Sequence, residues 1–151
     1  MLVGLVHDNS VRVMVRQDVL TPQEYLAWLS QADLLLMPYD REVYRSRGSG
    51  VFSDARAIGI PVVATQGCAF AQPAFDEGWG VAMEEYNGPG LGSAILTALA
   101  RLEDLDARAS LAAHQAHDGL GRILQATVES AANSKPTGLA SIVRRWAAGS
   151  S

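Results

Sequence analysis

Two continuous apolar runs constrain the fold of this chain more than any other feature. One is Leu34–Met37, which Pro38 ends, and the other is Pro61–Ala64. Neither run alternates with polar residues, which is typical of strands covered on both faces of a parallel sheet. Between them, Val51–Ile58 has helical apolar spacing, and Gly59 suits the position that follows a helix. Strand, helix and strand in this order predict a parallel βαβ unit and an α/β fold.

The rest of the chain continues this alternation of strands and helices. β-Branched residues predict a strand over Val11–Val15, and the sequence from Thr21 to Glu24 is typical of a capping box that opens a helix ending near Asp33. Further expected elements are a loop over 39–50, a strand over 80–83, a helix over 91–102, Ala-rich helices over 107–116 and 120–132 separated at Gly119 and Gly121, and a turn over 134–138. Residues 1–10 are interpreted as the tail of a helix.

Composition limits the class of protein. The length of 151 residues fits a single domain. A formal net charge of -4 disfavours a broad nucleic-acid surface, which needs clustered positive charge. The single cysteine, Cys68, excludes an intramolecular disulfide and a multi-cysteine zinc site, so we expect a reducing, cytoplasmic location. No run approaches the roughly 20 apolar residues of a membrane-spanning helix. We therefore expect a soluble chain whose membrane association is at most peripheral.

The most informative residues lie in the loop before the helix over 51–58. A helix that opens near Ser49 leaves its first backbone N–H groups free to receive an anion. Gly48 and Gly50 let a ligand approach the main chain, because neither carries a Cβ. Arg45 and Arg47 add forked donors that suit phosphate oxygens. Together these residues predict a diphosphate site.

Asp54 lies one helical turn after Gly50, and helix side chains lean toward the helix start. Because a diphosphate repels an acid, we expect Asp54 to bind a pair of neutral hydroxyls, such as a ribose diol. The same residues also allow a structural interpretation. In that interpretation the loop is a solvated connection with a capping serine, Asp54 faces solvent and Arg47 pairs with Glu42. Spacing alone leaves both interpretations open.

Two separated motifs resemble one protein family. The first is Ala32–Asp40 (ADLLLMPYD), followed by Tyr44, Arg45 and Gly48–Phe52, and the second is Asp54–Ala64 (DARAIGIPVVA). They resemble the donor-binding half of GT-B glycosyltransferases, in particular the large retaining group 1, or family 4, over most of residues 11–130. The resemblance implies a Rossmann-like, three-layer α/β/α fold with a parallel sheet. This chain would then be an incomplete C-terminal half of a GT-B fold.

The resemblance also implies residue roles. Gly50 and Val51 would offer backbone N–H groups to the donor diphosphate, and Asp54 would hold the ribose at the second acidic position of a Glu-x7-Glu pattern. Ser46 stands at the first acidic position, which normally addresses the donor sugar. The expected substrate-binding residues are Arg45, Arg47, Gly48, Ser49, Gly50, Val51 and Asp54, and no catalytic residue is assigned.

The activity that the resemblance implies is transfer of a sugar from a nucleotide-diphosphate sugar, without a metal or other cofactor. The acceptor lobe of such an enzyme is missing, so we expect residues 1–151 to form one shortened nucleotide-sugar-binding domain with an Ala-rich helical region from about residue 91. One alternative is a non-catalytic nucleotide-diphosphate-binding module or a subunit that needs a partner. A GT-B-like epimerase of nucleotide sugars is another.

Other reactive side chains are assigned structural roles. His114 and His117 have a spacing that can hold a metal, but no third ligand stands at a matching spacing, so we expect a solvated helix face. Cys68 is expected to be a small buried thiol. The tryptophans are expected to pack, although Trp79 can also contact an acceptor or another lobe.

Overall fold

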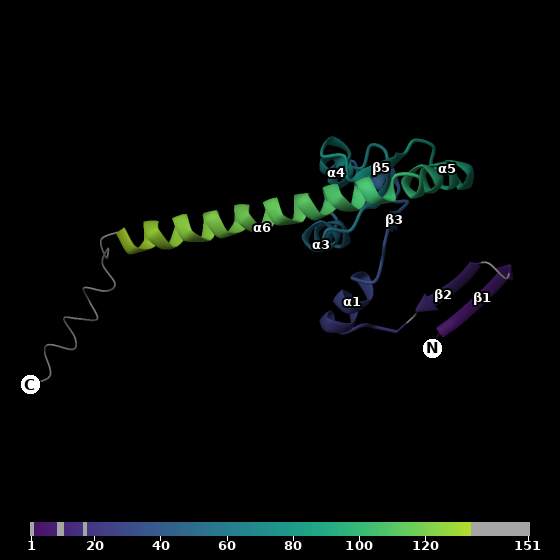
Figure 1. Ribbon diagram of the computed structural model, residues 1–151, viewed down its shortest axis with the longest axis horizontal. Helices are drawn as coiled ribbons and strands as arrows, with labels where there is room; N and C mark the ends of the chain where they lie inside the picture. The colour runs from purple at the N-terminus through teal and green to yellow at the C-terminus, as the bar shows by residue number, and fades with distance from the viewer. Residues whose placement is uncertain (1, 9–10, 17, 134–151) are drawn as a thin grey trace, which may run out of the picture.

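The computed structural model describes residues 2–8, 11–16 and 18–133 (Figure 1). The elements follow one another as β1 (Leu2–Asp8), β2 (Val11–Arg16), α1 (Pro22–Leu29), β3 (Leu35–Met37), α2 (Arg41–Tyr44), α3 (Gly50–Ile58), β4 (Val62–Thr65), the 3₁₀ turn η1 (Ala69–Ala71), α4 (Gln72–Asp76), β5 (Gly80–Met83), α5 (Gly88–Leu99) and α6 (Leu102–Asn133). The turn predicted over 134–138 and Trp146 lie outside the described residues.

A three-stranded parallel sheet forms the centre of the fold. Its strand order is β3-β4-β5, with Leu35 opposite Val62 and Val62 opposite Gly80. The middle strand β4 is buried along its whole length, because it has a neighbouring strand on each side and helices above and below. The strands predicted from the two apolar runs and from residues 80–83 are confirmed. The chain is a mixed α/β protein.

Helices cover both faces of this sheet. Adjacent residues of a strand point to opposite faces, and in β4 they enter different apolar clusters. Val62 packs in the cluster that contains Phe52 of α3 and Ala109 of α6. Val63 packs in the cluster that contains Ala98 of α5 and Leu105 of α6. The first turns of α6 therefore pack against side chains from both faces of the sheet.

The local signals for the shorter helices are confirmed. At the start of α1, the Thr21 hydroxyl accepts a hydrogen bond from the Glu24 N–H at 3.3 Å, and the Glu24 carboxylate accepts one from the Thr21 N–H at 2.9 Å. At the end of α3, Gly59 has a φ of 84°, and a Cβ there would lie 3.2 Å from the Cα of Ser110. Glycine is therefore required at residue 59 both by the backbone conformation and by the close approach of α6.

The amino-terminal segment differs from the prediction in two ways. Residues 1–10 were expected to be the tail of a helix, but residues 2–8 form strand β1. The strand over Val11–Val15 is present as β2, yet it pairs antiparallel with β1 in a separate two-stranded sheet rather than joining the parallel sheet. The apolar pattern specifies a strand but not its neighbour, and closing a short connection to an adjacent segment costs little entropy.

Two further predictions, one of a loop and one of a pair of helices, are also wrong. The loop expected over 39–50 contains the short helix α2, which Asp40 caps by accepting a hydrogen bond from the Glu42 N–H at 2.8 Å. The two Ala-rich helices expected after residue 107 are one helix, α6. Gly119 and Gly121 continue it because neither has a positive φ. Glycine weakens a helix interior but ends a helix only when the backbone turns to the left-handed conformation.

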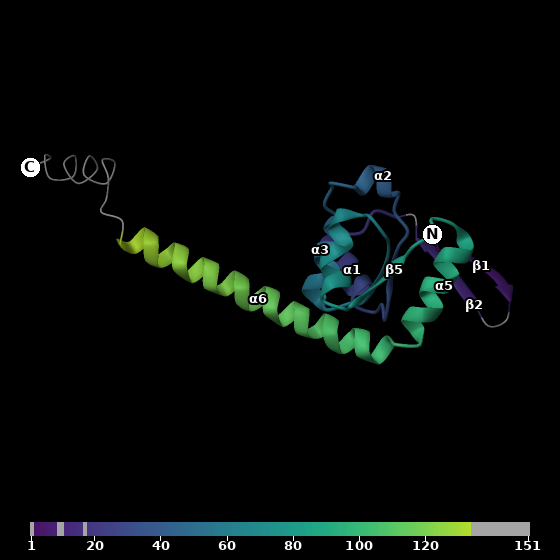
Figure 2. The same ribbon diagram turned by 90° about the horizontal axis from the view of Figure 1, so that it is seen from above.

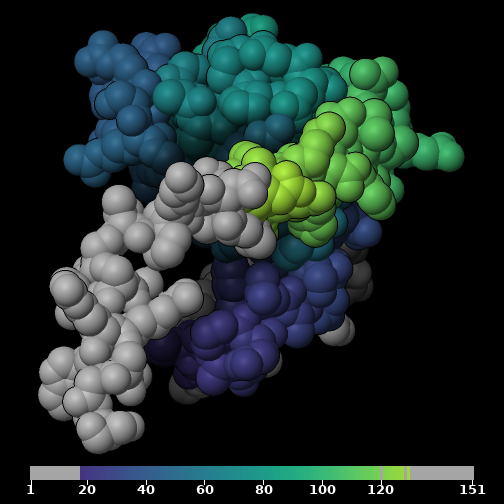
Figure 3. All heavy atoms as spheres, turned by 90° about the vertical axis from the view of Figure 1, so that its left-hand side faces the viewer, coloured from purple at the N-terminus to yellow at the C-terminus, as the bar shows by residue number. Residues whose placement is uncertain are grey.

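The long helix α6 leaves the α/β unit and extends far beyond it (Figures 1 and 2). Seen from the carboxyl-terminal side, the segment near residues 20–30 lies on one side of α6 and the segment near residues 60–80 lies on the other (Figure 3). Among the described residues, no helix combines the length and the apolar character needed to cross a membrane.

Candidate functional site

The predicted anion site lies where α3 begins, beyond the carboxyl end of β3. Ser49 is the N-cap, and its hydroxyl accepts a hydrogen bond from the Phe52 N–H at 3.3 Å. The Ser53 N–H donates to the Ser49 carbonyl at 3.1 Å. The N–H groups of Gly50 and Val51 have no hydrogen-bond acceptor among residues 2–8, 11–16 and 18–133. Two donors at the positive end of this helix are thus available to a ligand.

Neither a close contact nor the backbone conformation requires glycine at Gly48 or Gly50. A Cβ at Gly48 or Gly50 would meet no atom within 4 Å. Neither residue has a positive φ, so alanine fits the backbone at both. Both positions therefore leave room beside the first turn of α3, where an anion would approach the N–H groups.

The two arginines of the loop are exposed and differ in their ionic partners. The guanidinium of Arg45 lies 3.7 Å from the Glu42 carboxylate, and its side chain is 77% exposed. Glu42 also lies 3.9 Å from Arg41, whereas no ion pair joins it to Arg47. The structural alternative that paired Arg47 with Glu42 is therefore wrong. Arg47 has no acidic partner in the described part of the chain.

Asp54 connects two helices. One oxygen of its carboxylate accepts a hydrogen bond from the Tyr25 hydroxyl of α1 at 3.1 Å. Burial raises the pKa of Tyr25, and the hydrogen bond and the charge of Asp54 raise it further. The alternative in which Asp54 only faces solvent is therefore wrong. Its second carboxylate oxygen has no hydrogen-bond donor within the described residues.

An aromatic cluster supports the loop and was not predicted from the sequence. Tyr39 follows β3 and Tyr44 ends α2, and their rings lie 4.7 Å apart and 5.6 Å from the ring of Phe70. The ring of Phe70 also lies 5.4 Å from the ring of Phe52 in α3. The ring of Phe52 in turn stacks on that of Trp79, with the ring centres 5.3 Å apart. These contacts position α2 and the first turn of α3. Trp79 is fully buried, so the prediction that it packs is confirmed, and its side chain is not exposed to contact an acceptor.

A buried hydroxyl at the same end of the sheet was also missed. Thr65 is the last residue of β4, is 1% exposed, and its hydroxyl has no hydrogen-bond partner in the described residues. Buried polar groups in proteins are nearly always paired. The sequence gives no signal for this feature, since a threonine that ends a strand is ordinary.

The remaining candidate residues have structural contacts. Cys68 is buried, as predicted, and burial together with the charge of Asp40 raises the pKa of its thiol. Nδ1 of His114 lies 2.7 Å from the Ser110 carbonyl oxygen of the same helix. Within the residues that the structure describes, no three His, Cys, Asp or Glu side chains are grouped so as to hold a metal ion.

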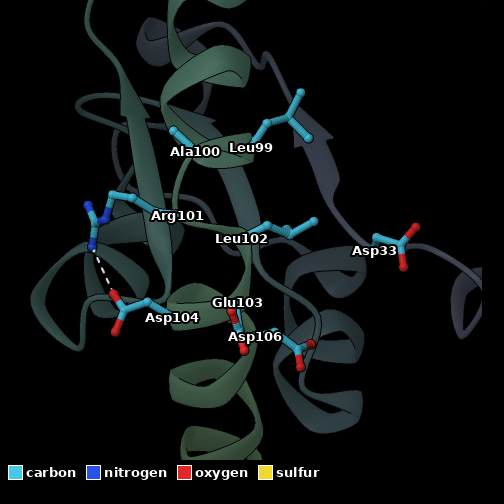
Figure 4. A pocket seen from close by; sticks show the side chains of 8 residues that line it. All are labelled: Asp33, Leu99, Ala100, Arg101, Leu102, Glu103, Asp104 and Asp106. Carbon is cyan, nitrogen blue, oxygen red and sulfur yellow. Dashed lines mark hydrogen bonds and ion pairs between the residues drawn. The ribbon is translucent and has the colours of Figure 1, made fainter.

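A cavity of about 840 Å³ lies at the opposite end of the sheet (Figure 4). Asp33 lines it from the segment that leads into β3, and the other lining residues come from the connection between α5 and α6. Asp104 accepts hydrogen bonds from Arg108 and Arg101, which hold its pKa below the usual value. Four of the lining residues are acids and only Arg101 is basic, so this cavity disfavours an anion.

A smaller cavity of about 250 Å³ lies nearer the predicted site. It is bounded by Pro38, which follows β3, by Met83 at the end of β5, and by residues 86–88 and Leu91 around the start of α5. It therefore opens at the carboxyl ends of the strands, where ligands of open α/β sheets usually bind.

Comparison of this chain with models of protein families, with characterised proteins and with solved structures found no match.

Proposed function

We propose that this chain is the donor-binding lobe of a glycosyltransferase and binds a nucleotide-diphosphate sugar at the start of α3. The observation that carries the proposal is the pair of unpaired N–H groups of Gly50 and Val51 behind an open approach. A hydrogen bond from such a group to a charged oxygen contributes about 1.5–3 kcal/mol. The motifs at residues 32–64, which resemble family 4 glycosyltransferases, support the assignment of that anion to a diphosphate.

The charged residues around α3 suit the parts of such a donor. Arg47 is exposed without an acidic partner in the described residues and supplies a forked donor for phosphate oxygens. Asp54 has one carboxylate oxygen that Tyr25 leaves free, and this oxygen would accept a hydrogen bond from a ribose hydroxyl. In a complete enzyme, the Gly50 and Val51 N–H groups would stabilise the departing diphosphate during sugar transfer. The acceptor would be held by a second lobe.

Isothermal titration calorimetry with UDP, GDP and their sugars tests the donor site. We expect diphosphate-dependent binding, with no binding of uridine or guanosine. Arg47→Ala and Asp54→Ala should each weaken it. Arg101→Ala is the matched control, because Arg101 is an arginine at the opposite end of the sheet. Equal affinity in the wild type and in both site variants would contradict the assignment.

A second candidate function is a nucleotide-diphosphate-binding module without turnover. Ser46 favours it, because a hydroxyl stands where the similar family carries the acid that addresses the donor sugar. A turnover assay distinguishes the two functions. Product formation is measured with the chain alone and again with an acceptor lobe added. Product only in the presence of that lobe supports the transferase, and no product in either case supports the module.

A further inference from the structure

The carboxyl-terminal half of α6 has no partner within the described residues. Ala112 and Ala113 are buried and Ala116 is half-buried. From residue 121 onward, every residue whose exposure the structure describes is exposed, including Ile123 at 64% and Leu124 at 57%. Figures 1 and 2 show this part of α6 projecting away from the α/β unit.

The face of α6 that packs in the core continues into the projecting part. Leu105, Ala109, Ala112 and Ala116 follow one another at alternating steps of four and three residues. The same steps lead on to Gly119, Ile123 and Ala126. This spacing is the heptad pattern by which one helix packs along another. Ile123 therefore stands on the continuation of the buried face, at a point where nothing in the described residues covers it.

The projecting part is a poor helix by itself. Gly119 and Gly121 each weaken it by about 1 kcal/mol relative to alanine. A Cβ on either glycine would meet no atom within 4 Å, so contacts within the described residues do not explain them. Most helices in proteins are stabilised by the packing of an apolar face. This part of α6 is therefore expected to pack against another helix.

We propose that residues 116–133 of α6 pair antiparallel with the same residues of a second copy of this chain. In the heptad register, Ile123 of one copy lies opposite Ala126 of the other, and Ala116 lies opposite Asn133. The pairing thus begins where the α/β unit stops covering α6 and ends where α6 ends, over about 27 Å. The two α/β units lie at opposite ends of the pair.

Charge complementarity selects this partner and this direction. Arg122 and Glu129 both occupy heptad position g, on one flank of the packing face. In an antiparallel pair of helices, this flank of one copy lies beside the same flank of the other. Arg122 of each copy is then beside Glu129 of the other. Arg122 has no ion pair in the described part of the chain, and Glu129 uses one oxygen to accept a hydrogen bond from Gln125 at 3.1 Å. A parallel pair would instead place Arg122 beside the uncharged Thr127.

Sedimentation equilibrium of the full chain over a wide range of protein concentration tests the pairing. We expect a monomer–dimer equilibrium that salt weakens. Arg122→Glu and Glu129→Arg each convert two attractive pairs into two repulsive ones, so each should raise the dimer dissociation constant about tenfold. The double variant R122E/E129R restores both pairs and should return the constant to that of the wild type. Asp118→Lys, a charge reversal on the far side of α6, is the control and should change it little.

Circular dichroism of each variant checks that α6 stays helical. Because the double variant carries both substitutions, its recovery separates a lost ion pair from a damaged fold. A chain that remains monomeric at every concentration would overturn the proposal. So would a dimer that both single reversals leave unchanged, or one that the double variant fails to restore.

Discussion

Replacing Gly50 with alanine separates the folding role of the α3 start from its binding role. A Cβ at Gly50 meets nothing within 4 Å, and the residue has no positive φ. The added methyl group therefore costs the fold nothing. It stands on the first residue of α3, beside the N–H groups to which the proposed diphosphate would bind, and we expect it to displace the diphosphate from one of them.

The two effects have opposite signs. Removing the conformational freedom of glycine from the unfolded chain should raise the free energy of unfolding by about 0.4–1 kcal/mol. Loss of one hydrogen bond to a charged phosphate oxygen should reduce the binding free energy by about 1.5–3 kcal/mol. At about 1.4 kcal/mol for each tenfold change, the dissociation constant of UDP or GDP should rise by roughly one to two orders of magnitude.

Urea denaturation and titration calorimetry measure these two quantities on the same protein. Gly92→Ala is the control, because a Cβ at this residue of α5 would also meet nothing within 4 Å and Gly92 does not line the cavity of about 250 Å³. This control should show a similar gain in stability with unchanged affinity. If Gly50→Ala binds as tightly as the wild type, the diphosphate does not approach the start of α3, and the site assignment fails.

Two further substitutions test the contacts that hold the site. Gly59→Ala places a Cβ 3.2 Å from the Cα of Ser110 in a residue with a φ of 84°, so it should lower the free energy of unfolding by at least about 1–2 kcal/mol in urea denaturation; an unchanged midpoint would contradict the close packing of α3 on α6. Tyr25→Phe removes the hydrogen bond to Asp54 and should cost about 0.5–1.5 kcal/mol. Because the pKa of Tyr25 is raised above 10.0, folding favours the protonated phenol, and wild-type stability should fall as the pH rises above 10.0. The variant should lose this part of the pH dependence, and identical alkaline unfolding curves for the two proteins would argue against the contact.

Features set by neighbouring residues were predictable from the sequence. The apolar runs that became β3 and β4, the capping box of α1 and the serine cap of α3 each depend on residues only a few positions apart. Such signals act through local backbone geometry and short hydrogen bonds, so the sequence contains them in full.

Features that depend on distant residues were decided by the tertiary structure. The sequence alone determined that Val11–Val15 is a strand, but the fold placed it beside β1 instead of β3. Asp54 was selected as a binding residue, yet its contact with Tyr25 joins two helices. Trp79 was expected to pack, but the fold decided that its partner is Phe52 of α3. The physical reason is common to all three: periodicity records which residues avoid water, whereas the identity of the group that covers them depends on how separate elements pack.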